Sequence, residues 1–517
     1  MATVPHTVET NGNNARKNLQ SFAPATGELL GEVPFTSSDE VRATVARARK
    51  AQAAWGVLPI DERCERLLRY RDALVDRAEE IIEVVSRECG KPRTDALSEV
   101  MITVDLLTYY CKNAATILAP QEQQLHLMKH KRSTIHFAPR GVVGVVSPWN
   151  FPFVIPIGDA VAALVSGNAV VIKPSEITPL TVAKAKEIFD GTGLPEDLFG
   201  VVQGYGDVGA TLIESGIQKL VFTGGTATGR KVAEACGRNL VPMVMELGGK
   251  APLVACADCD VERTAQAIVW GGFFNAGQAC ISVERVYAHE AIHDALLDRV
   301  KSLVGGLRHG DPSGGAVDVG ALTFAKQIDI AEKHVADATA KGARVVAGGK
   351  RPAAPGQFFE PTILANCNHT MTVMREEIFG PIVPFQKVAS EDEAILLAND
   401  SHLGLNAYVF TKDRAKGARL ARRIEAGAVV VNDVISNYAA AEVPFGGVKQ
   451  SGFGRIHGDG ALRDMCDQRI VFSGRLPEPG ADPTWFPYTP KSFKWQLRLM
   501  RALYTRGGIV KRVKSMF

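Results

Sequence analysis

The sequence lacks several features that would place it in a specialised class of protein. Its nine cysteines are few and odd in number for 517 residues. They therefore argue against a disulfide framework and fit a reducing compartment. The formal net charge is only +3, which is too small to indicate nucleic-acid binding. Hydrophobic residues make up 46% and charged residues 22%, a composition that excludes disorder for most of the chain.

No long apolar run is free of helix-breaking residues. The best candidate for a membrane span, residues 142–172, has Asp159 as its only charge but contains several prolines, glycines and asparagines. A spanning helix of about 20 residues would not carry so many breakers, so we expect buried strands and a buried helix. The polar N-terminus, which includes Glu9, has no apolar core of a secretory signal. These observations predict a cytoplasmic protein.

The chain is too long for one hydrophobic core, since single cores stop growing at roughly 250–300 residues. Residues 39–118 show apolar side chains at helical spacing, and residues 125–137 alternate as in an exposed hairpin. Short apolar strands then alternate with helices, which predicts an α/β fold with a parallel, doubly wound sheet. The expected strands are 169–175, 199–204, 219–225 and 241–249, and the expected helices are 178–190, 207–215 and 226–237. A second α/β series follows Gly249, which indicates two α/β domains.

Two glycine-rich segments are candidates for phosphate binding. Gly204-x-Gly206-x-x-Gly209 matches a dinucleotide fingerprint, but the acidic residue expected about 20 residues later is missing. The segment 223–229, TGGTATG, directly follows an apolar strand. Its glycines would let the backbone approach a phosphate at a helix N-terminus. The alternative is an ordinary glycine-rich turn.

Lys173 and Glu176 follow another predicted strand. Open α/β sheets bind ligands at the carboxyl ends of their strands, where a carboxylate can accept both hydroxyls of a ribose and a lysine can bond the same sugar. The alternative is a solvated ion pair on a surface loop.

Three further residues could carry chemistry. Small residues precede Cys280, which would leave room for a substrate carbonyl beside a nucleophilic thiol. Glu246 ends an apolar strand and precedes two glycines, a setting that can tune a carboxylate into a general base. Asn150 offers a side-chain amide for an oxyanion. Taken singly, each has an ordinary structural explanation as a buried thiol or a turn residue.

Taken together, these segments resemble the aldehyde dehydrogenase superfamily. The resemblance runs from about Asn18 to about Phe472, and is carried in order by SPWNFPF, VVIKPSE, FTGGTATG, MELGGK, FFNAGQACIS, REEIFGPI and PFGGVKQSGFGRIHG. It implies a Rossmann-type cofactor domain, an α/β catalytic domain and a small β oligomerisation element. The implied boundaries are 1–124 with 141–248, then 249–448, then 125–140 with 466–475, followed by a Pro/Gly linker and tail at 476–517.

The resemblance also implies roles for individual residues. Cys280 would attack an aldehyde, the Asn150 amide and the Cys280 backbone N–H would hold the thiohemiacetal oxyanion, and Glu246 would activate water to hydrolyse the thioester. The implied NAD contacts are Ser147, Pro148, Trp149, Lys173, Ser175, Glu176, Gly206, Thr223, Gly224, Gly225, Thr226, Gly229, Leu247, Glu377 and Phe379.

Two details bear on the coenzyme. Glu176 favours NAD because it would repel the 2′-phosphate of NADP, whereas the small Ser175 leaves NADP open. Gly225 stands where many family members carry serine, so the phosphate contact there would be made by the backbone alone.

The shared motifs do not choose the substrate, which we expect to be an aliphatic aldehyde or succinate semialdehyde. The lining of the aldehyde tunnel would depend on residues around Phe153, Trp270, Phe274, Ile281 and Tyr438, whose mostly apolar character favours an alkyl or aryl chain. A CoA-acylating enzyme is an alternative, but that branch typically lacks the glutamate. A non-catalytic binding or structural protein is another, against which Cys280, Glu246 and Asn150 argue together. The family resemblance implies a homodimer or homotetramer. No metal is expected, because Cys256-x-x-Cys259 has no second pair and His126 and His130 lie in the presumed hairpin.

The C-terminal segment is strongly basic. Residues 491–517 contain eight basic and no acidic side chains. On a helix, Lys494, Arg498 and Arg501 would share one face, and Trp495, Leu499, Ala502 and Leu503 another. A basic amphipathic helix indicates peripheral contact with a membrane surface. The alternative is packing against the catalytic domain or a partner subunit.

Overall fold

The computed structural model describes residues 18–477, 480, 482 and 484–514. The chain divides into two compact units, one within residues 1–119 and 137–467 and the other within 120–136 and 468–517. The N-terminal residues on which the signal-peptide prediction rests, and part of the expected 476–490 linker, lie outside the described residues.

The first unit begins with a small hairpin and a run of helices. Strands β1 (Asn18–Phe22) and β2 (Leu29–Pro34) pair antiparallel. The helices that follow are α1 (Ser38–Trp55), α2 (Ile60–Asp76), α3 (Ala78–Cys89) and α4 (Arg93–Ile117). The Ser37 hydroxyl accepts a hydrogen bond from the backbone of Glu40 at the start of α1, which is a standard N-cap. The helical prediction for residues 39–118 is confirmed.

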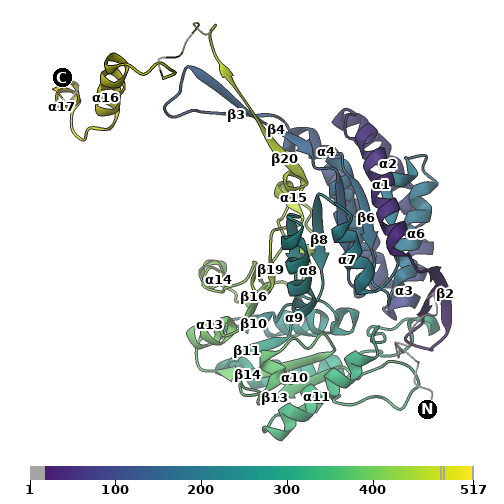
Figure 1. The fold of residues 1–517 in the computed structure, drawn as a ribbon. Helices are drawn as coiled ribbons and strands as arrows, with labels where there is room; N and C mark the ends of the chain where they lie inside the picture. The colour runs from purple at the N-terminus through teal and green to yellow at the C-terminus, as the bar shows by residue number, and fades with distance from the viewer. Residues whose placement is uncertain (1–17, 478–479, 481, 483, 515–517) are drawn as a thin grey trace. The chain divides into compact units, whose positions relative to one another are not determined.

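The first large sheet has the predicted strand–helix alternation. Among the described residues its strand order is β19-β9-β8-β5-β6-β7, with all pairs parallel except β19 with β9. The strands are β5 (Val142–Val146), β6 (Ala169–Lys173), β7 (Phe199–Val201), β8 (Lys219–Thr223), β9 (Met243–Glu246) and β19 (Gly452–Phe453). The helices between them are α5 (Val154–Val165), α6 (Pro179–Asp190), α7 (Gly206–Glu214) and α8 (Thr226–Arg238), with the 3-10 helix η1 (Glu196–Leu198) before β7. Figure 1 shows helices on both sides of this sheet.

The strand order creates a switch point beside β5. From β5 the chain adds β6 and β7 on one side and then β8 and β9 on the other. The loops that leave β5 and β8 therefore diverge to opposite faces, and a crevice opens between them at the carboxyl edge of the sheet. Ligands of open α/β sheets bind in this position.

The apolar stretch 142–172 folds into β5, α5 and β6, as predicted. Every residue of α5 and β6 is buried, so burial within the domain accounts for its apolar composition. Within the described part of the chain, the helices are either too short or too polar to cross a membrane.

A second α/β sheet lies in the same unit, below the first in Figure 1. Among the described residues its strand order is β12-β13-β14-β11-β10-β16-β17, parallel except for β12 with β13. The strands are β10 (Pro252–Ala255), β11 (Arg285–His289), β12 (Arg344–Ala347), β13 (Thr362–Ala365), β14 (Ile382–Val388), β16 (Asn406–Phe410) and β17 (Ala428–Val431). Its main helices are α9 (Val261–Phe273), α10 (Glu290–Val304), α11 (Lys326–Ala340), α13 (Glu391–Asn399) and α14 (Arg414–Ala421).

Shorter elements complete this unit. They are η2 (Phe274–Gly277), η3 (Pro312–Gly314), α12 (Thr372–Arg375), β15 (Leu403–Gly404), η4 (Ser436–Tyr438), β18 (Val448–Lys449) and α15 (Gly458–Asp464). Buried apolar residues of both large sheets belong to one continuous core.

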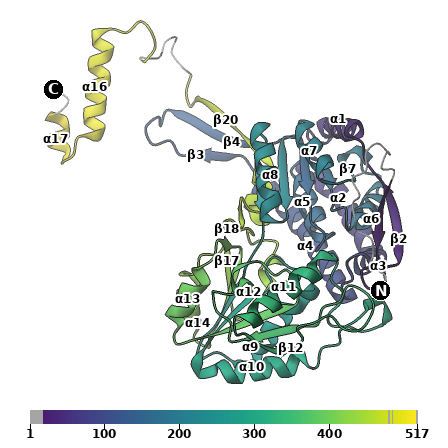
Figure 2. The ribbon, with the colours of Figure 1, turned by 60° about the horizontal axis from the view of Figure 1, so that its bottom comes forward.

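The second unit contains a small sheet and the tail. Its strands β3 (Gln121–Gln123), β4 (Lys131–Pro139) and β20 (Cys466–Gly474) are ordered β20-β4-β3. The hairpin begins at Gln121, earlier than the expected residue 125, because the polar segment QEQ carries no strand pattern in the sequence. Helices α16 (Pro490–Tyr504) and α17 (Ile509–Lys514) follow, and Figure 2 shows them beside each other.

The pairing of β19 with β9 depends on a glycine. Gly452 stands opposite Glu246 with φ +113°, and a Cβ built on it would lie 1.8 Å from the carbonyl oxygen of Met245. We expect Gly452→Ala to destabilise the protein by about 1–3 kcal/mol and to lower its Tm by a few degrees in calorimetry. Gly237→Ala is the control, because its Cβ would meet open space on α8 and alanine favours a helix. An unchanged Tm for Gly452→Ala would contradict the assigned geometry.

Candidate active site

The switch point brings together residues from three strands. The loop after β5 carries Ser147 and Asn150, both buried, while β8 ends at Thr223 and β9 at Glu246. Thr223 and Glu246 are direct partners in the β8–β9 register. Because these strands are parallel, their carboxyl ends meet at one edge of the sheet. Three segments that are far apart in sequence therefore form one site.

A cavity of about 330 Å³ opens at this edge. Its lining comprises Pro148, Trp149, Asn150, Ile155, Thr223, Gly224, Gly225, Glu246, Leu247, Gly248, Cys280, Phe324, Gln327, Ile330, Glu377 and Phe379. The hydroxyls of Ser147 and Thr223 and both carboxylate oxygens of Glu246 are buried without a partner among the described residues. Buried polar atoms need partners, so the site suits a polar ligand such as the nicotinamide and phosphate portions of NAD(P). Gly225 has open space at its Cβ position.

Lys173 and Glu176 lie at the end of β6, next to β5. The Lys173 ammonium is 3.5 Å from a Glu176 carboxylate oxygen and 2.8 Å from the Pro174 carbonyl. Burial lowers the pKa of Lys173, whereas the Glu176 side chain is 38% exposed. The Ser175 hydroxyl accepts a hydrogen bond from the backbone of Ile177. This carboxylate is therefore within reach of a ligand in the crevice.

The fingerprint Gly204-x-Gly206-x-x-Gly209 lies farther from the switch point than the segment 223–229 does. Gly206 begins α7 after the edge strand β7, and β6 separates β7 from β5. Gly209 lies near the Lys173 side chain, 3.5 Å from its Cδ measured from a built Cβ. In contrast, Thr226 is the first residue of α8 and follows β8 directly, and Gly229 lies in that helix's first turns against Leu247. The segment 223–229 is thus better placed than Gly206 for a phosphate at the crevice.

A strained turn presents Cys280. Asn275 and Ala276 have φ of 51° and 54° in η2, a conformation that L-residues rarely adopt. The Asn150 side-chain amide donates to the Gln278 carbonyl at 2.9 Å, which places Asn150 next to the Cys280 turn. Left-handed non-glycine residues persist only where surrounding structure holds them, often at functional sites.

The thiol of Cys280 is enclosed. Burial raises its pKa, and the charges of Glu377 and Glu246 raise it further, while the backbone N–H groups of Cys280 and Ile281 lower it. No helix of the described chain begins at Cys280, so backbone amides of the turn, rather than a helix N-terminus, lower the pKa of this thiol. The backbone amides of the turn therefore favour the thiolate that a nucleophilic cysteine needs.

Glu246 is suited to act as a general base towards water. Its carboxylate is 3% exposed, and burial raises its pKa well above the ordinary value, with a further increase from the charge of Asp159. Asp159, on α5, is itself buried, and burial raises its pKa to about 8. In the sequence, Asp159 is only the single charge of an apolar stretch, because its proximity to Glu246 arises when α5 packs on the sheet.

Two glycines after Glu246 allow a close approach of three chain segments. A Cβ on Gly249 would lie 1.9 Å from the Cys280 carbonyl oxygen, and one on Gly248 would lie 2.6 Å from a Glu377 oxygen. The Gly249 N–H donates to Glu377 at 2.8 Å. Burial raises the pKa of Glu377 to about 8. The glycines therefore bring the thiol turn, the base and Glu377 together.

A buried ion pair holds the segment that carries Glu377 and Phe379. Glu284 accepts hydrogen bonds from the backbone N–H groups of Ile378 and Phe379, and pairs with the Lys250 ammonium at 2.8 Å. Phe379 has a left-handed φ of 51°. The sequence gives no signal for Glu284, because it is one acidic residue before an ordinary strand.

A second buried ion pair holds the Asn150 loop. Glu99 on α4 accepts from the backbone N–H groups of Phe153 and Val154, and pairs with the Lys91 ammonium at 2.7 Å. Lys91 also donates to the Asn150 carbonyl at 2.6 Å. Sequence analysis missed these two residues too, since their partners lie on distant elements.

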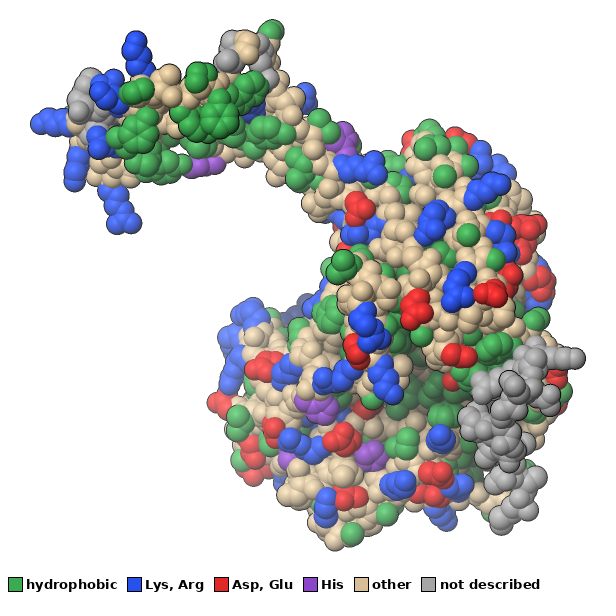
Figure 3. Space-filling view, in the orientation of Figure 1, with side chains coloured by type: hydrophobic (Ala, Val, Ile, Leu, Met, Phe, Trp, Pro, Cys, Tyr) green, Lys and Arg blue, Asp and Glu red, His purple; other side chains and the backbone are tan. Residues whose placement is uncertain are grey.

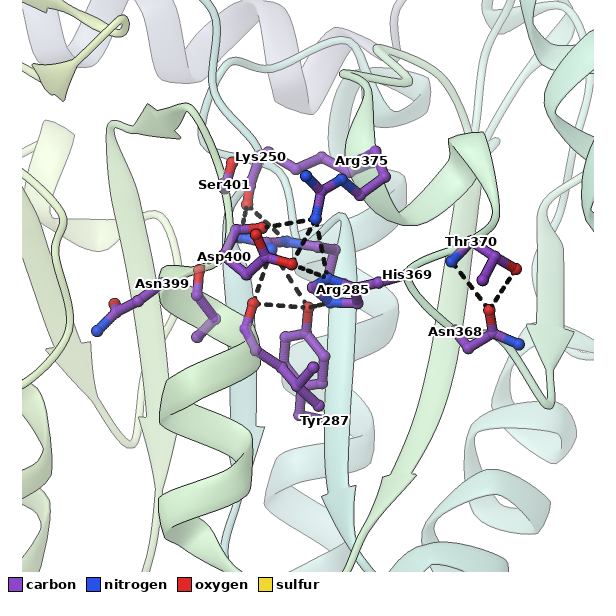
Figure 4. Close-up of polar contacts among 12 residues, drawn as sticks. Lys250, Arg285, Tyr287, Asn368, His369, Thr370, Arg375, Asn399, Asp400 and Ser401 are labelled. Carbon is purple, nitrogen blue, oxygen red and sulfur yellow. Dashed lines mark hydrogen bonds and ion pairs between the residues drawn. The ribbon is translucent and has the colours of Figure 1, made fainter.

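The network of polar side chains in Figure 4 holds the backbone at Lys250 in place. The buried Arg285 guanidinium donates to the Lys250 carbonyl at 2.8 Å and lies 3.2 Å from the Tyr287 hydroxyl. Tyr287 is hydrogen-bonded to His369, and His369 to Asp400. This chain fixes the backbone on the carboxyl side of the two glycines.

A second cavity, of about 290 Å³, opens on the other side of the thiol. Its lining is almost entirely apolar: Ser98, Glu99, Met101, Ile102, Phe151, Val154, Ile155, Trp270, Phe274, Ala279, Cys280, Ile281, Ile435, Ser436, Tyr438 and Ala439. Trp270, Phe274, Ile281 and Tyr438 line it, as the sequence suggested. Phe153, which the sequence also suggested, is fully buried outside the lining.

The described residues give little support for a metal site. One cluster, Cys256 with Asp258 and Glu391, has ligand atoms within 4.8 Å of one another. The ammonium of Lys416 already pairs with both carboxylates. His126 and His130 are exposed and belong to no cluster found in the described chain.

Comparison with known proteins agrees with this geometry. The sequence profile of the aldehyde dehydrogenase family matches residues 10–471. The chain belongs to the aldehyde dehydrogenase family. Its α/β fold and its classification as an enzyme follow from that membership, and aldehyde dehydrogenases use NAD or NADP.

Individual members are similar over nearly the whole chain. A 4,4′-diapolycopene aldehyde oxidase of Methylomonas is 37% identical, covering 96% of this chain and 93% of that protein. A protein of Mycolicibacterium smegmatis, provisionally named an NADP(+)-dependent succinate-semialdehyde dehydrogenase, is 39% identical over 89% of this chain and 90% of its own. The crystal structure of an NAD-dependent aldehyde dehydrogenase from Sinorhizobium meliloti matches with a TM-score of 0.86 and 33% identity, covering 91% of this chain and 93% of that one.

Glu284 offers a test of the supporting contacts. We expect Glu284→Ala to raise the Kd for NADH about tenfold or more, because the segment with Glu377 and Phe379 loses a charged acceptor. Glu284→Gln keeps one carbonyl acceptor and should have a smaller effect. Fluorescence titration with NADH measures the Kd of each variant, and circular dichroism checks that the variant is folded. Glu290→Ala, at an exposed position on α10, is the control, and equal Kd values for all variants would contradict the positioning role.

Proposed function

We propose that this aldehyde dehydrogenase oxidises an apolar aldehyde to its carboxylic acid, with Cys280 as nucleophile and Glu246 as general base. The observation that carries the proposal is the position of Cys280, which lines both cavities. One cavity is apolar and suits a hydrocarbon chain. The other lies at the switch point and suits the nicotinamide end of the coenzyme.

The chemistry follows from the groups around the thiol. The Cys280 thiolate adds to the aldehyde carbon, and the oxyanion of the thiohemiacetal accepts hydrogen bonds from the Asn150 amide and the Cys280 backbone N–H. When bound, the nicotinamide coenzyme supplies the acceptor for the hydride that leaves this carbon as the thioester forms. Glu246 then takes a proton from a water that attacks the thioester, and the thiolate leaves with release of the acid.

We propose NAD as the preferred coenzyme. Lys173, Ser175 and Glu176 would hold the adenosine ribose, and the Glu176 carboxylate disfavours a 2′-phosphate by charge repulsion. Its Lys173 partner, 3.5 Å away, offsets part of that repulsion, so NADP should be used less efficiently rather than rejected. The remaining contacts would come from Ser147, Pro148, Trp149, Gly206, Thr223–Gly225, Thr226, Gly229, Leu247, Glu377 and Phe379.

The apolar cavity favours an apolar aldehyde over succinate semialdehyde as the substrate. Its described lining includes no lysine, arginine or histidine, so the carboxylate of succinate semialdehyde would be buried without a cation, which is costly. An alkyl, aryl or polyene aldehyde buries only apolar surface there. The relative named for diapolycopene aldehyde supports this choice, whereas those named for succinate semialdehyde support the other.

The two alternative functions have less support. A CoA-acylating enzyme does not need the buried base that Glu246 provides. A non-catalytic scaffold does not explain a strained Cys280 turn beside an unpartnered Glu246 carboxylate.

We also propose that the subunits associate into a homodimer or homotetramer through the small sheet of the second unit. Its edge strand β20 exposes Ile470, Val471 and Phe472, and long apolar edge strands tend to pair with another chain. Sedimentation of the purified protein measures the subunit number. We place the enzyme in the cytoplasm and propose that its tail contacts the membrane surface peripherally. An apolar aldehyde would concentrate in that membrane.

Initial rates of NADH or NADPH formation test the substrate and coenzyme together. The panel comprises hexanal, decanal, benzaldehyde and succinate semialdehyde, each with NAD and with NADP, in the absence of CoA. We expect the highest kcat/KM for decanal with NAD, because its chain fills the apolar cavity. A preference for succinate semialdehyde would reject the apolar assignment, and dependence on CoA would reject hydrolysis by Glu246.

Glu246→Gln separates the two halves of the reaction. We expect a burst of about one NADH per active site followed by steady turnover at least about 100-fold slower, because general-base assistance contributes 10²–10⁴-fold. The wild-type kcat should rise with pH, since the raised pKa of Glu246 keeps part of the base protonated at low pH, and the variant should lose this dependence. Cys280→Ala should show no burst while still binding NADH. Full turnover by Glu246→Gln would reject the proposed base.

A further inference from the structure

The tail is an amphipathic structure with a broad apolar surface. No residue of α16 or α17 is buried within the chain. Phe493, Trp495, Leu499, Met500 and Leu503 on α16 are between 40% and 66% exposed. Figure 3 shows hydrophobic side chains gathered on this part of the molecule, with lysine and arginine side chains around them. So large an exposed apolar surface indicates an interaction site.

The apolar surface continues on both sides of α16. Before it, Trp485, Phe486 and Tyr488 are at least 63% exposed, and after it Ile509 and Val510 on α17 are at least 69% exposed. Aromatic residues with a polar edge prefer the boundary between lipid and water. The surface is therefore longer than one helix.

The charges of the tail define the kind of partner. The last acidic residue of the chain is Asp482, and the basic residues after it include Lys491, Lys494, Lys511 and Lys514. At about 100° per residue, Lys491 and Lys494 lie within about 60° of each other around α16, whereas Leu499 and Leu503 lie about 80–180° from them. A partner that is negatively charged at its surface and apolar beneath would match both sides of the helix. A bilayer that contains anionic phospholipids has these two properties.

Helix α16 has strong signals for helix formation at its N-terminus. Thr489 caps it by accepting from the Ser492 backbone, the Ser492 side chain completes a capping box, and Pro490 occupies the first turn. Isolated helices of this length are marginal in water, so capping and burial at an interface together favour the helical state. The family profile ends at residue 471, so the tail is additional to the catalytic fold.

We propose that α16 and α17 bind the enzyme to the surface of membranes rich in anionic phospholipid, with the lysines at the headgroups and Leu499, Leu503 and Trp495 among the upper acyl chains. This interaction does not depend on the identity of the substrate. It concerns the tail alone, and Cys280 and Glu246 take no part in it.

Flotation of the full-length enzyme with vesicles tests the proposal. One set of vesicles contains phosphatidylcholine with phosphatidylglycerol, and the other contains phosphatidylcholine alone. We expect strong flotation with the anionic set, weaker flotation with the neutral set, and release from the anionic set by high salt. Absence of flotation with both sets would overturn the proposal.

Two paired variants separate the charged and apolar contributions. Lys491→Gln with Lys494→Gln should weaken partition to anionic vesicles about 25-fold, at about fivefold for each charge, with little change for neutral ones. Leu499→Gln with Leu503→Gln should weaken partition to both sets. Lys333→Gln and Leu240→Gln, at exposed positions of the first unit, are matched controls and should float like the wild type. Equal flotation of all variants would overturn the assignment to α16.

Two further measurements complete the test. Turnover of hexanal in solution should be unchanged in every tail variant, which keeps a failure of the tail proposal distinct from a failure of the proposed function. Sedimentation without lipid should give the same mass for the wild type and the Leu499/Leu503 variant. A smaller mass for that variant would assign the apolar face to a second copy of the chain and overturn the membrane assignment.

Discussion

The close contact at Gly248 and Gly249 is the constraint on which the active site depends. It is the point where the end of the first sheet, the Cys280 turn and the Glu377 segment meet, and no side chain fits between them. The surrounding hydrogen bonds maintain this contact: the Ser451 hydroxyl donates to the Gly248 carbonyl at 2.6 Å, and the Gly249 N–H donates to Glu377. Backbone packing thus fixes how the segments that carry the proposed base and the proposed nucleophile lie against each other.

Buried ion pairs extend this rigidity to the rest of the site. Lys91 with Glu99 and Lys250 with Glu284 each use one carboxylate to bind two successive backbone N–H groups of a functional segment. Buried pairs add little net stability, but removing one partner leaves an uncompensated charge. The role of these ion pairs is to hold the two functional segments in position. They hold strained residues such as Phe379 in conformations that the local sequence would not select.

The catalytic unit and the tail meet different physical demands. The catalytic unit buries most of its apolar residues in one large core. The described helices α16 and α17 contain no buried residue, and α16 relies on capping and charge. An enzyme with an apolar substrate cavity benefits from a nearby lipid phase, because apolar aldehydes partition into bilayers and their concentration in water is low.

Much of the fold could be predicted from the sequence, because hydrophobic periodicity and glycine-rich turns are local signals. The helices over 39–118, the alternation that yields β6 to β9 and the nature of the 142–172 stretch are of this kind. Cys280, Glu246 and Asn150 could be singled out because the motifs around them are short and contiguous. The sequence by itself therefore determined the α/β class and the family, and it supplied the residues that we propose as reactive groups. Only the tertiary structure decided that β5 and β8 form the switch point, that Asp159, Glu284 and Glu99 support the site, and that Phe151 rather than Phe153 lines the apolar cavity. These features depend on contacts between segments far apart in the chain, and no local pattern encodes such contacts.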